Sequence, residues 1–259
     1  MPDFDTSVPH SARVYDYWLG GKDNFAADRE AAERALEAYP NMVFAVRANR
    51  AFLSRAVRYL VNAGIRQFLD IGTGIPTASN THQVAQEAAP DCRIVYVDND
   101  PIVLSHARVL LTSTKEGACA YVDEDLRDPD SILAAAAETL DFTQPVAVLL
   151  LSVLHLVPDD AEASQVVTRL LAECVPGSYL TISHPASDID SEQTAEVTRR
   201  LNQAQVSPAK MRDKQSIAAL FTDFELVPPG VVPVPKWRPR SALEASSPAA
   251  LWSAVARKP

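Results

Sequence analysis

The strongest constraint on the fold is an alternation of short apolar runs with helical stretches that begins near residue 65. Five runs rich in β-branched and other apolar residues cover residues 66–71, 93–99, 118–125, 145–152 and 178–184. They are nearly continuously apolar, which is typical of strands covered on both faces of a sheet. The stretches between them have helical character, at residues 77–90, 100–114, 128–140 and 159–177. The pattern predicts a doubly wound α/β fold around a mostly parallel sheet.

The flanking segments are expected to be helical before the alternation and irregular after it. Residues 1–12 look like a flexible arm, followed by a helix that starts with Asp28 as its N-cap. A second helix runs through residues 41–64, with Phe44 on its apolar side and Gly64 just past its end. Asp100 and Asp128, each before a proline, are predicted N-caps, and Gly177 is predicted to close a helix. After two further helical stretches, the proline-rich residues 224–240 and the run at 251–259 predict an antiparallel edge to the sheet.

Charge and cysteine usage restrict the partners and the compartment. The net charge of -9 argues against general binding to nucleic acid phosphates or to an anionic membrane surface. Three cysteines with no C-x-x-C pair favour buried thiols in a reducing compartment over disulfides or a zinc site. The longest apolar run, residues 145–158, is too short to span a bilayer, and the N-terminus lacks the apolar core of a secretory signal. We expect a cytoplasmic protein without a metal, bound to neither nucleic acid nor membrane.

The first predicted strand leads into a glycine-containing turn, "FLDIGTGIPT", at residues 68–77. Gly72 and Gly74 allow a sharp turn and the close approach of a ligand to the backbone. Asp70 precedes them, and a carboxylate there suits a cationic ligand, such as an ammonium or sulfonium, better than a phosphate. A dinucleotide-binding fingerprint needs a third glycine where this chain has Thr77. The alternative is a tight turn with no ligand.

Acidic residues also follow the second and third predicted strands. Asp98 comes 28 residues after Asp70, where a carboxylate can accept two hydrogen bonds from a ribose diol. Asp125 is placed to bond an adenine amino group while the backbone of Leu126 reads a ring nitrogen. The alternatives are that Asp98 caps a helix and that Asp125 belongs to a solvated acidic loop.

The segments after the fourth and fifth predicted strands should meet the reacting end of a ligand bound at this edge of the sheet. Ser152 to His155 follow the fourth strand, and His155 is a candidate base or substrate-orienting group. His184 ends the fifth strand in a corresponding position. A histidine among leucines and valines is also a common packed residue, so a structural role for either stays open.

In this order, the four stretches resemble the motifs of class I S-adenosylmethionine-dependent methyltransferases. Residues 70–74 look like the first motif, residues 95–100 contain the ribose acid, residues 123–126 the adenine acid, and residues 149–157 the fourth motif. Residues 12–29, 49–60 and 237–239 further resemble one bacterial S-adenosyl methyltransferase family within that class, formerly catalogued as a domain of unknown function.

The resemblance implies a Rossmann-like seven-stranded sheet with an antiparallel last strand, and S-adenosyl-L-methionine as cofactor. It implies in-line methyl transfer by a methyltransferase domain at residues 65–259, preceded by a helical extension or lid at residues 1–64. No Asn-Pro-Pro-Tyr-like stretch follows the fourth strand, which favours a small-molecule substrate. The residues that the resemblance assigns to the cofactor are Asp70, Gly72, Thr73, Gly74, Asp98, Asn99, Asp125, Leu126 and Ser152.

The segment "YDYWLGGKDNF", residues 15–25, is interpreted as a cover over the substrate pocket. Its adjacent glycines, Gly20 and Gly21, would supply a hinge or tight turn, and its aromatic residues would form apolar walls with polar tips. The candidate substrate or lid residues are Tyr15, Tyr17, Lys22, Asn24, Arg50 and His184. The alternatives are an arm packed on the sheet and, for the arginines of residues 47–58, a solvated helix face.

The sequence alone leaves two other functions open. A nicotinamide-dependent oxidoreductase would use a similar sheet, although the missing third glycine and the presence of Asp70 speak against it. A protein that binds S-adenosylmethionine without catalysis is also compatible, because no obvious general base is present.

Overall fold

The computed structural model describes residues 5–77, 79–103, 105, 112–204, 206 and 208–259. Its strands form one sheet in the order β3-β2-β1-β4-β5-β8-β6, and β7 also pairs with β8. The strands are β1 Gln67–Ile71, β2 Arg93–Asp98, β3 Ala118–Asp123, β4 Ala147–Leu151, β5 Tyr179–Pro185, β6 Glu225–Leu226, β7 Val232–Pro233 and β8 Leu251–Arg257.

The first five strands are parallel and the later ones antiparallel, as the sequence predicts. Asp70 of β1 lies beside Tyr96 of β2 and Leu149 of β4, whereas β8 runs antiparallel to β5 with Ile182 beside Ala254. The path through the sheet has the seven expected strands, and the two-residue β7 is an eighth. The proline-rich segment pairs only in two-residue pieces because proline donates no hydrogen bond to a ladder.

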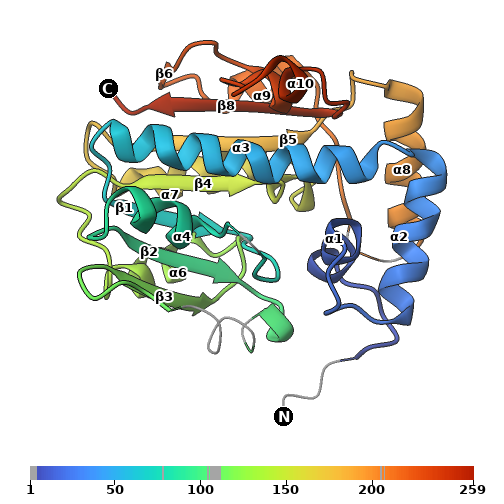
Figure 1. The fold of residues 1–259 in the computed structure, drawn as a ribbon, viewed down its shortest axis with the longest axis horizontal. Helices are drawn as coiled ribbons and strands as arrows, with labels where there is room; N and C mark the ends of the chain where they lie inside the picture. The colour runs from blue at the N-terminus through green and yellow to red at the C-terminus, as the bar shows by residue number, and fades with distance from the viewer. Residues whose placement is uncertain (1–4, 78, 104, 106–111, 205, 207) are drawn as a thin grey trace.

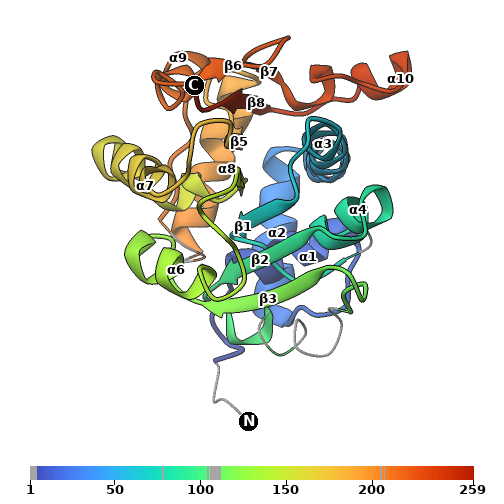
Figure 2. The same cartoon turned by 90° about the vertical axis from the view of Figure 1, so that its left-hand side faces the viewer.

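Helices cover both faces of the sheet and one end of it (Figures 1 and 2). In Figure 2, α3 and α4 lie on one face and α6 and α7 on the other. In Figure 1, α1, α2 and α8 lie beyond the carboxyl ends of the parallel strands. The helices are α1 Ser11–Leu19, α2 Ala26–Ala38, α3 Met42–Asn62, α4 Thr81–Ala88, α6 Pro129–Ala136, α7 Asp160–Ala172, α8 Ser191–Gln203, α9 Lys214–Ala219 and α10 Ala242–Ala245, with short 3₁₀ turns η1 Leu154–Leu156 and η2 Val234–Lys236.

Alternate residues of the central strands enter two separate hydrophobic cores, which explains why these strands are apolar throughout. Phe68 and Ile94 pack in the core under α3, and Leu69 and Val95 pack in the core under α6 and α7. All four side chains are fully buried. The sheet is therefore stabilised from both sides, and its carboxyl edge is held in a fixed position.

Several details of the helices differ from the sequence predictions. Asp28 is the third residue of α2 rather than its N-cap, since its carboxylate bonds back to the amide of Phe25. Phe44 is 51% exposed instead of buried, because it lies at the free N-terminal turn of α3. α7 ends at Ala172 with Glu173 as its C-cap, and Gly177 lies in the following turn.

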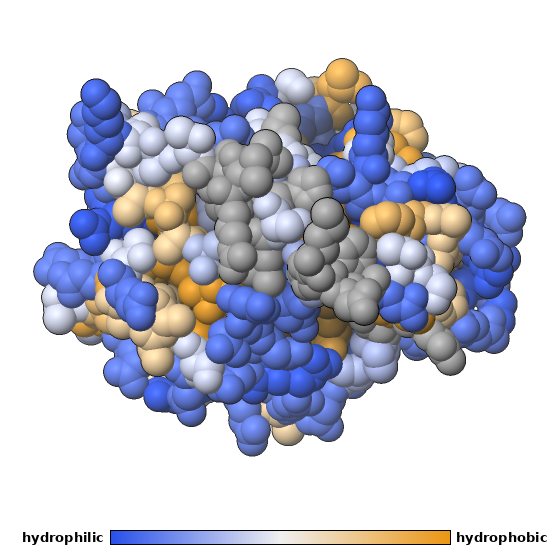
Figure 3. Space-filling model, turned by 90° about the horizontal axis from the view of Figure 1, so that it is seen from below, coloured by the Kyte–Doolittle hydropathy of each residue, from blue (hydrophilic) through white to orange (hydrophobic). Residues whose placement is uncertain are grey.

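Of the predicted helix at residues 100–114, residues 104 and 106–111 lie outside the described residues; residues 101–103 and 105 are helical, and residues 112–114 are not. At its start, Asp100 accepts a hydrogen bond from the Ile102 amide at 2.8 Å, as an N-cap does. Seen from below, the molecule is largely hydrophilic, with apolar side chains showing between polar ones (Figure 3). None of the described helices is both long and apolar enough to cross a membrane.

Candidate functional site

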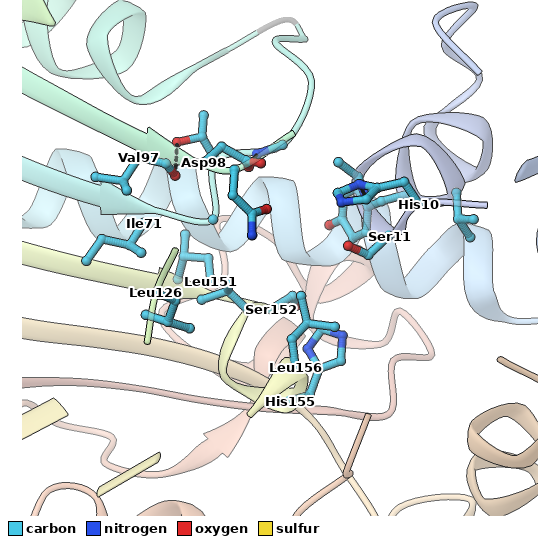
Figure 4. A pocket seen from close by; sticks show the side chains of 18 of the residues that line it. His10, Ser11, Ile71, Val97, Asp98, Leu126, Leu151, Ser152, His155 and Leu156 are labelled. Carbon is cyan, nitrogen blue, oxygen red and sulfur yellow. Dashed lines mark hydrogen bonds between the residues drawn. The ribbon is translucent and has the colours of Figure 1, made fainter. Parts of the chain in front are cut away.

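A cavity of about 180 Å³ opens at the carboxyl ends of the parallel strands, between the sheet, α1 and α3 (Figure 4). All nine residues that the sequence assigns to the cofactor line it, as do His155, Tyr15 and Arg50. Tyr17, Lys22, Asn24 and His184 do not line it. The topology brings these segments together because parallel strands all end at this edge.

The turn after β1 needs its two glycines for different reasons. Gly72 has a φ of 71°, and a Cβ there would meet the side chain of Val153 at 2.3 Å. Gly74 has a φ of 67°, and a Cβ there would meet nothing within 4 Å. Between them, the hydroxyl of Thr73 donates to the Asp70 carbonyl at 3.1 Å. The first glycine allows the backbone to pass the β4 loop, and the second faces open space beside the cavity.

Asp70 is a buried acid at the end of β1 and is only 5% exposed. The Thr81 hydroxyl donates to its carboxylate at 2.6 Å. Burial raises its pKa to about 6, against the opposing effects of the Thr81 hydrogen bond and the positive charge of Arg50. A cation in the cavity would favour the ionised form of this group, which makes Asp70 suited to a positively charged ligand.

Asp98 lies at the end of β2 with both carboxylate oxygens at the cavity edge. One oxygen accepts from the Gly74 amide at 2.8 Å and the other from the Asp100 amide at 3.0 Å. Burial raises the pKa of Asp98, and the two amide hydrogen bonds oppose that shift. Asp100 caps the next helix instead, so Asp98 is held in place while each of its oxygens retains a second lone pair.

A third acidic residue, Asp125, lies beyond β3 and is bonded to Asn99, the residue that follows Asp98. The side-chain amide of Asn99 donates to Asp125 at 3.0 Å, and the Arg127 amide donates to the other oxygen of Asp125 at 2.8 Å. Leu126 is 8% exposed and gives this end of the cavity an apolar wall. Asn99 and Asp125, with the apolar side chain of Leu126 beside them, are suited to bind a flat heterocycle that carries exocyclic polar atoms.

Ser152, after β4, belongs to a hydrogen-bond network that reaches α1. Asn49 of α3 is 4% exposed and donates to the hydroxyls of Ser152 and Tyr15, both at 3.1 Å. Its carbonyl oxygen accepts from Ser183 of β5 at 2.6 Å. Ser152 itself has a φ of 54°, which non-glycine residues rarely adopt. Asn49 therefore fixes the position of the strained residue at the cavity wall.

His155 lies in η1 and lines the cavity, whereas His184 is fully buried behind it. Their rings are arranged edge to face with centroids 6.1 Å apart, and Arg212 contacts His184 Nε2 at 3.0 Å. Burial lowers the pKa of His155 to about 4, and the Arg212 charge adds to the effect. Burial likewise lowers the pKa of His184 to about 3. Both imidazoles are neutral near pH 7, and His184 positions neighbouring groups rather than contacting the cavity.

The segment at residues 15–25 forms helix α1 and a tightly bonded turn. Gly20 caps α1 with a φ of 83°, and a Cβ at Gly21 would lie 1.9 Å from the Asp16 carboxylate. That carboxylate accepts from the Asp23 amide and the Asn24 side chain. The two glycines therefore form a hydrogen-bonded turn at the end of α1, which is the tight turn that the sequence offered as one of two expectations. Asn24 is structural, and Tyr17 bonds to Glu33 on the outer surface.

Residues 10–12 also line the cavity, although the sequence suggests a flexible arm there. His10 Nδ1 lies 2.8 Å from an oxygen of Asp100, and its amide donates to Asp28 at 2.9 Å. Asp28 is fully buried and also accepts from the Phe25 amide. These contacts join segments distant in sequence, so no local pattern reveals them.

No metal site is evident in the described part of the chain, where no three His, Cys, Asp or Glu side chains are grouped to hold an ion. Cys92 and Cys174 are buried free thiols, and Cys119 is half-buried. The ionisable groups of the cavity are thus the acids at the strand ends, two arginines, His10 and His155.

Comparisons with known proteins agree with this geometry. A family model described as S-adenosyl methyltransferase matches residues 1–259. The crystal structure of a DUF574 family protein from Streptomyces avermitilis is similar, with 45% identity over 98% of this chain and 99% of that chain and a TM-score of 0.95. The structure of a candidate methyltransferase from Thermobifida fusca YX has 38% identity over 99% and 97% of the two chains and a TM-score of 0.90.

A search of the curated proteins found no match. The family model nevertheless spans the whole chain, and both solved relatives share its fold from end to end. The acids at the strand ends are those expected of an enzyme whose cofactor carries a ribose, an adenine and a sulfonium. The chain belongs to the S-adenosyl methyltransferase family, and it is a methyltransferase that uses S-adenosyl-L-methionine.

Proposed function

We propose that this methyltransferase transfers the methyl group in line to a nucleophile on a small molecule, within the cavity at the carboxyl edge of the sheet. The observation that carries the proposal is the position of α1. Val14, Tyr15 and Trp18 of this helix line the cavity opposite the strand ends. A site closed by the chain's own N-terminal helix favours a small acceptor over a macromolecule.

The residues at the strand ends are proposed to hold the cofactor. Asp98 would accept the ribose hydroxyls through its remaining lone pairs, and Asp125 with Leu126 would bind the adenine. Asp70 and the turn of Gly72 and Gly74 would face the charged methionine part. When bound, S-adenosylmethionine supplies an electrophilic methyl group on a good leaving group.

The rest of the chain's contribution is proposed to be alignment and exclusion of water. Asn49 holds Ser152 at the wall, and Ser152 is proposed to contact the cofactor or the acceptor beside it. His155 is proposed to orient the acceptor. Its low pKa makes His155 a weak base, so we do not assign proton removal from the acceptor to it.

The assignment of separate roles to the N-terminal segment and to the rest of the chain is also a proposal. Residues 1–64 would form the cover and residues 65–259 the methyltransferase domain. The cover hypothesis is supported by Tyr15 and Arg50, which line the cavity from α1 and α3. Tyr17 and Lys22 lie outside it and are no longer proposed as substrate contacts. The net charge of -9 supports an acceptor other than nucleic acid, and the unpaired thiols support a cytoplasmic location.

The experiment that tests the proposal uses S-adenosylmethionine carrying a radioactive methyl group and a cell extract divided by size. We expect label to enter the fraction below about 1 kDa, and to depend on added enzyme. An Asp98→Ala variant should give little labelled product. Label confined to proteins or nucleic acids would contradict a small-molecule acceptor.

The nicotinamide alternative has no support from the structure or its relatives. Thr77 stands where the dinucleotide fingerprint needs a glycine, and the family match is to a methyltransferase. The same match argues against a protein that binds S-adenosylmethionine without catalysis.

A further inference from the structure

We propose that the methyl acceptor is an electrically neutral, largely apolar molecule whose hydroxyl or N–H group forms a hydrogen bond with the imidazole of His155. The inference rests on the proposed function. It concerns the part of the cavity away from the strand-end acids, here termed the acceptor chamber, which is lined by Val14, Trp18, His155, Leu156, Val157, Leu201, Val206 and Ala209.

The walls of the acceptor chamber are apolar. They come from three separate segments, which are α1, the η1 turn with the residue after it, and the end of α8 with the residues that follow. Trp18 is 8% exposed, and its indole N–H already donates to the Ala32 carbonyl at 3.1 Å. The ring therefore offers an apolar surface and no donor. Such walls gain free energy by covering apolar parts of a ligand.

The cations around the acceptor chamber are bound to acids and carbonyls away from it. Lys210 pairs with Asp160 at 2.7 Å, and Arg212 pairs with the same acid at 2.9 Å while donating to the carbonyls of Leu154 and Val157. Arg200 pairs with Glu37 at 2.8 Å. None of these three cations lines the cavity. Arg127 does line it, but its guanidinium is already bound to Asp125, Glu162 and the Leu156 carbonyl, so a carboxylate or phosphate on the acceptor would find no uncommitted counter-charge in the chamber.

His155 is the one ionisable side chain among the chamber residues defined above. Its Nδ1 is buried and has no hydrogen-bond partner in the described part of the chain. Buried polar atoms without partners are uncommon and call for an explanation. Because His155 lines the cavity, a ligand hydroxyl there would provide a polar contact for this imidazole after a small turn of the ring. Because burial and Arg212 keep the imidazole neutral, it would not attract an anion or balance a cation.

Three phenols that share a hydroxyl but differ in charge test the inference: 4-propylphenol, 4-hydroxyphenylacetate and tyramine. Each is titrated by calorimetry into the enzyme saturated with S-adenosylhomocysteine at pH 7.5. We expect 4-propylphenol to bind at least about tenfold more tightly than either charged phenol, because a buried charge without a partner is costly. Tighter binding of a charged phenol, or no binding of the neutral one at millimolar concentration, would overturn the inference.

Variants of His155 test the polar contact separately. His155→Leu should weaken 4-propylphenol binding by about three- to tenfold, the usual effect of one lost hydrogen bond. His155→Asn, which keeps a polar group near the position of Nδ1, should restore most of that affinity and guards against a Leu variant that fails to fold. The matched control is Tyr17→Phe, which removes a hydroxyl from the outer face of α1. Equal affinity in the Leu variant and the wild type would contradict a role for the imidazole.

The same titrations separate this inference from the function on which it rests. S-adenosylhomocysteine binding is measured first. Failure to bind it would defeat the proposed cofactor site, whereas normal cofactor binding with a preference for a charged phenol would defeat only the neutral-acceptor inference.

Discussion

Burial of the Asp70 carboxylate, the group proposed to face a cationic ligand, lowers the stability of the fold. Its pKa is about 6 in the folded protein and near 3.8 in an unfolded chain. Between these values the folded state binds more protons, so this group lowers the free energy of unfolding as pH rises from about 4 to 6. Above pH 6 the whole penalty is present, and it is relieved when a cation binds.

We therefore predict opposite effects of Asp70→Asn on stability and on binding. At pH 7 the ligand-free variant should be more stable by about 1–3 kcal/mol, and the difference should disappear near pH 4. Its affinity for S-adenosylmethionine should fall, and wild-type affinity should weaken as pH drops through about 6 while that of the variant does not. Denaturant unfolding and calorimetry over pH 4–8 measure both; a variant less stable than the wild type at pH 7 would contradict the explanation.

Residues whose role depends on local pattern were predictable, and those that depend on distant contacts were not. Asp98 could be found from its place after an apolar strand, because parallel strands put their carboxyl ends at one edge. Asn49 contacts Ser152 across 103 positions, and His10 meets Asp100 across 90, so neither pairing leaves a sequence signal. Arg212 contacts His184 Nε2 across 28 positions, and this pairing leaves no local sequence pattern either.

At the scale of elements, α1 is held over the cavity by a few buried polar contacts. Asp28 of α2 accepts from the amides of His10 and Phe25, and its carboxylate lies 3.7 Å from Arg13. These contacts join the N-terminal turn of α1 to the start of α2. The sequence predicted a cover here but not its helical form, since the glycine pair that ends α1 also suits a flexible loop.

Asp28→Ala should loosen α1 more than the rest of the molecule. Two amides lose their acceptor and the buried Arg13 loses an ion-pair partner, which together cost about 2–4 kcal/mol. Hydrogen exchange should increase in residues 11–19 relative to the strands, and S-adenosylhomocysteine affinity should fall. Glu33→Gln, which alters only the exposed contact with Tyr17, is the control. Unchanged exchange in α1 would show that Asp28 does not hold it.

At the scale of the whole molecule, the strand–helix alternation predicted a mostly parallel sheet with an antiparallel edge, but not how the proline-rich edge is attached. Arg55 of α3 makes that attachment. It is 7% exposed, donates to the carbonyls of Trp237 and Val234 at 2.8 Å, and pairs with Glu244. Trp237 is fully buried against Phe52, with ring centroids 5.4 Å apart.

Arg55→Met should destabilise the fold without altering the cavity. Two buried carbonyls lose their donor and Glu244 loses a partner, so we expect the free energy of unfolding to fall by about 2–4 kcal/mol. The affinity of the folded variant for S-adenosylhomocysteine should stay within about twofold of the wild type, because none of these residues lines the cavity. A large loss of affinity in the folded variant would show that this edge is coupled to the site.

The most direct test of the account is calorimetric titration of the wild type, Asp98→Ala and Asp128→Ala with S-adenosylhomocysteine. Asp98 is proposed to bind the ribose, whereas Asp128 caps α6 away from the cavity and controls for the loss of an acid. We predict micromolar or tighter binding to the wild type and to Asp128→Ala, and at least about tenfold weaker binding to Asp98→Ala. Equal affinity of a folded Asp98→Ala variant would contradict the proposed cofactor site.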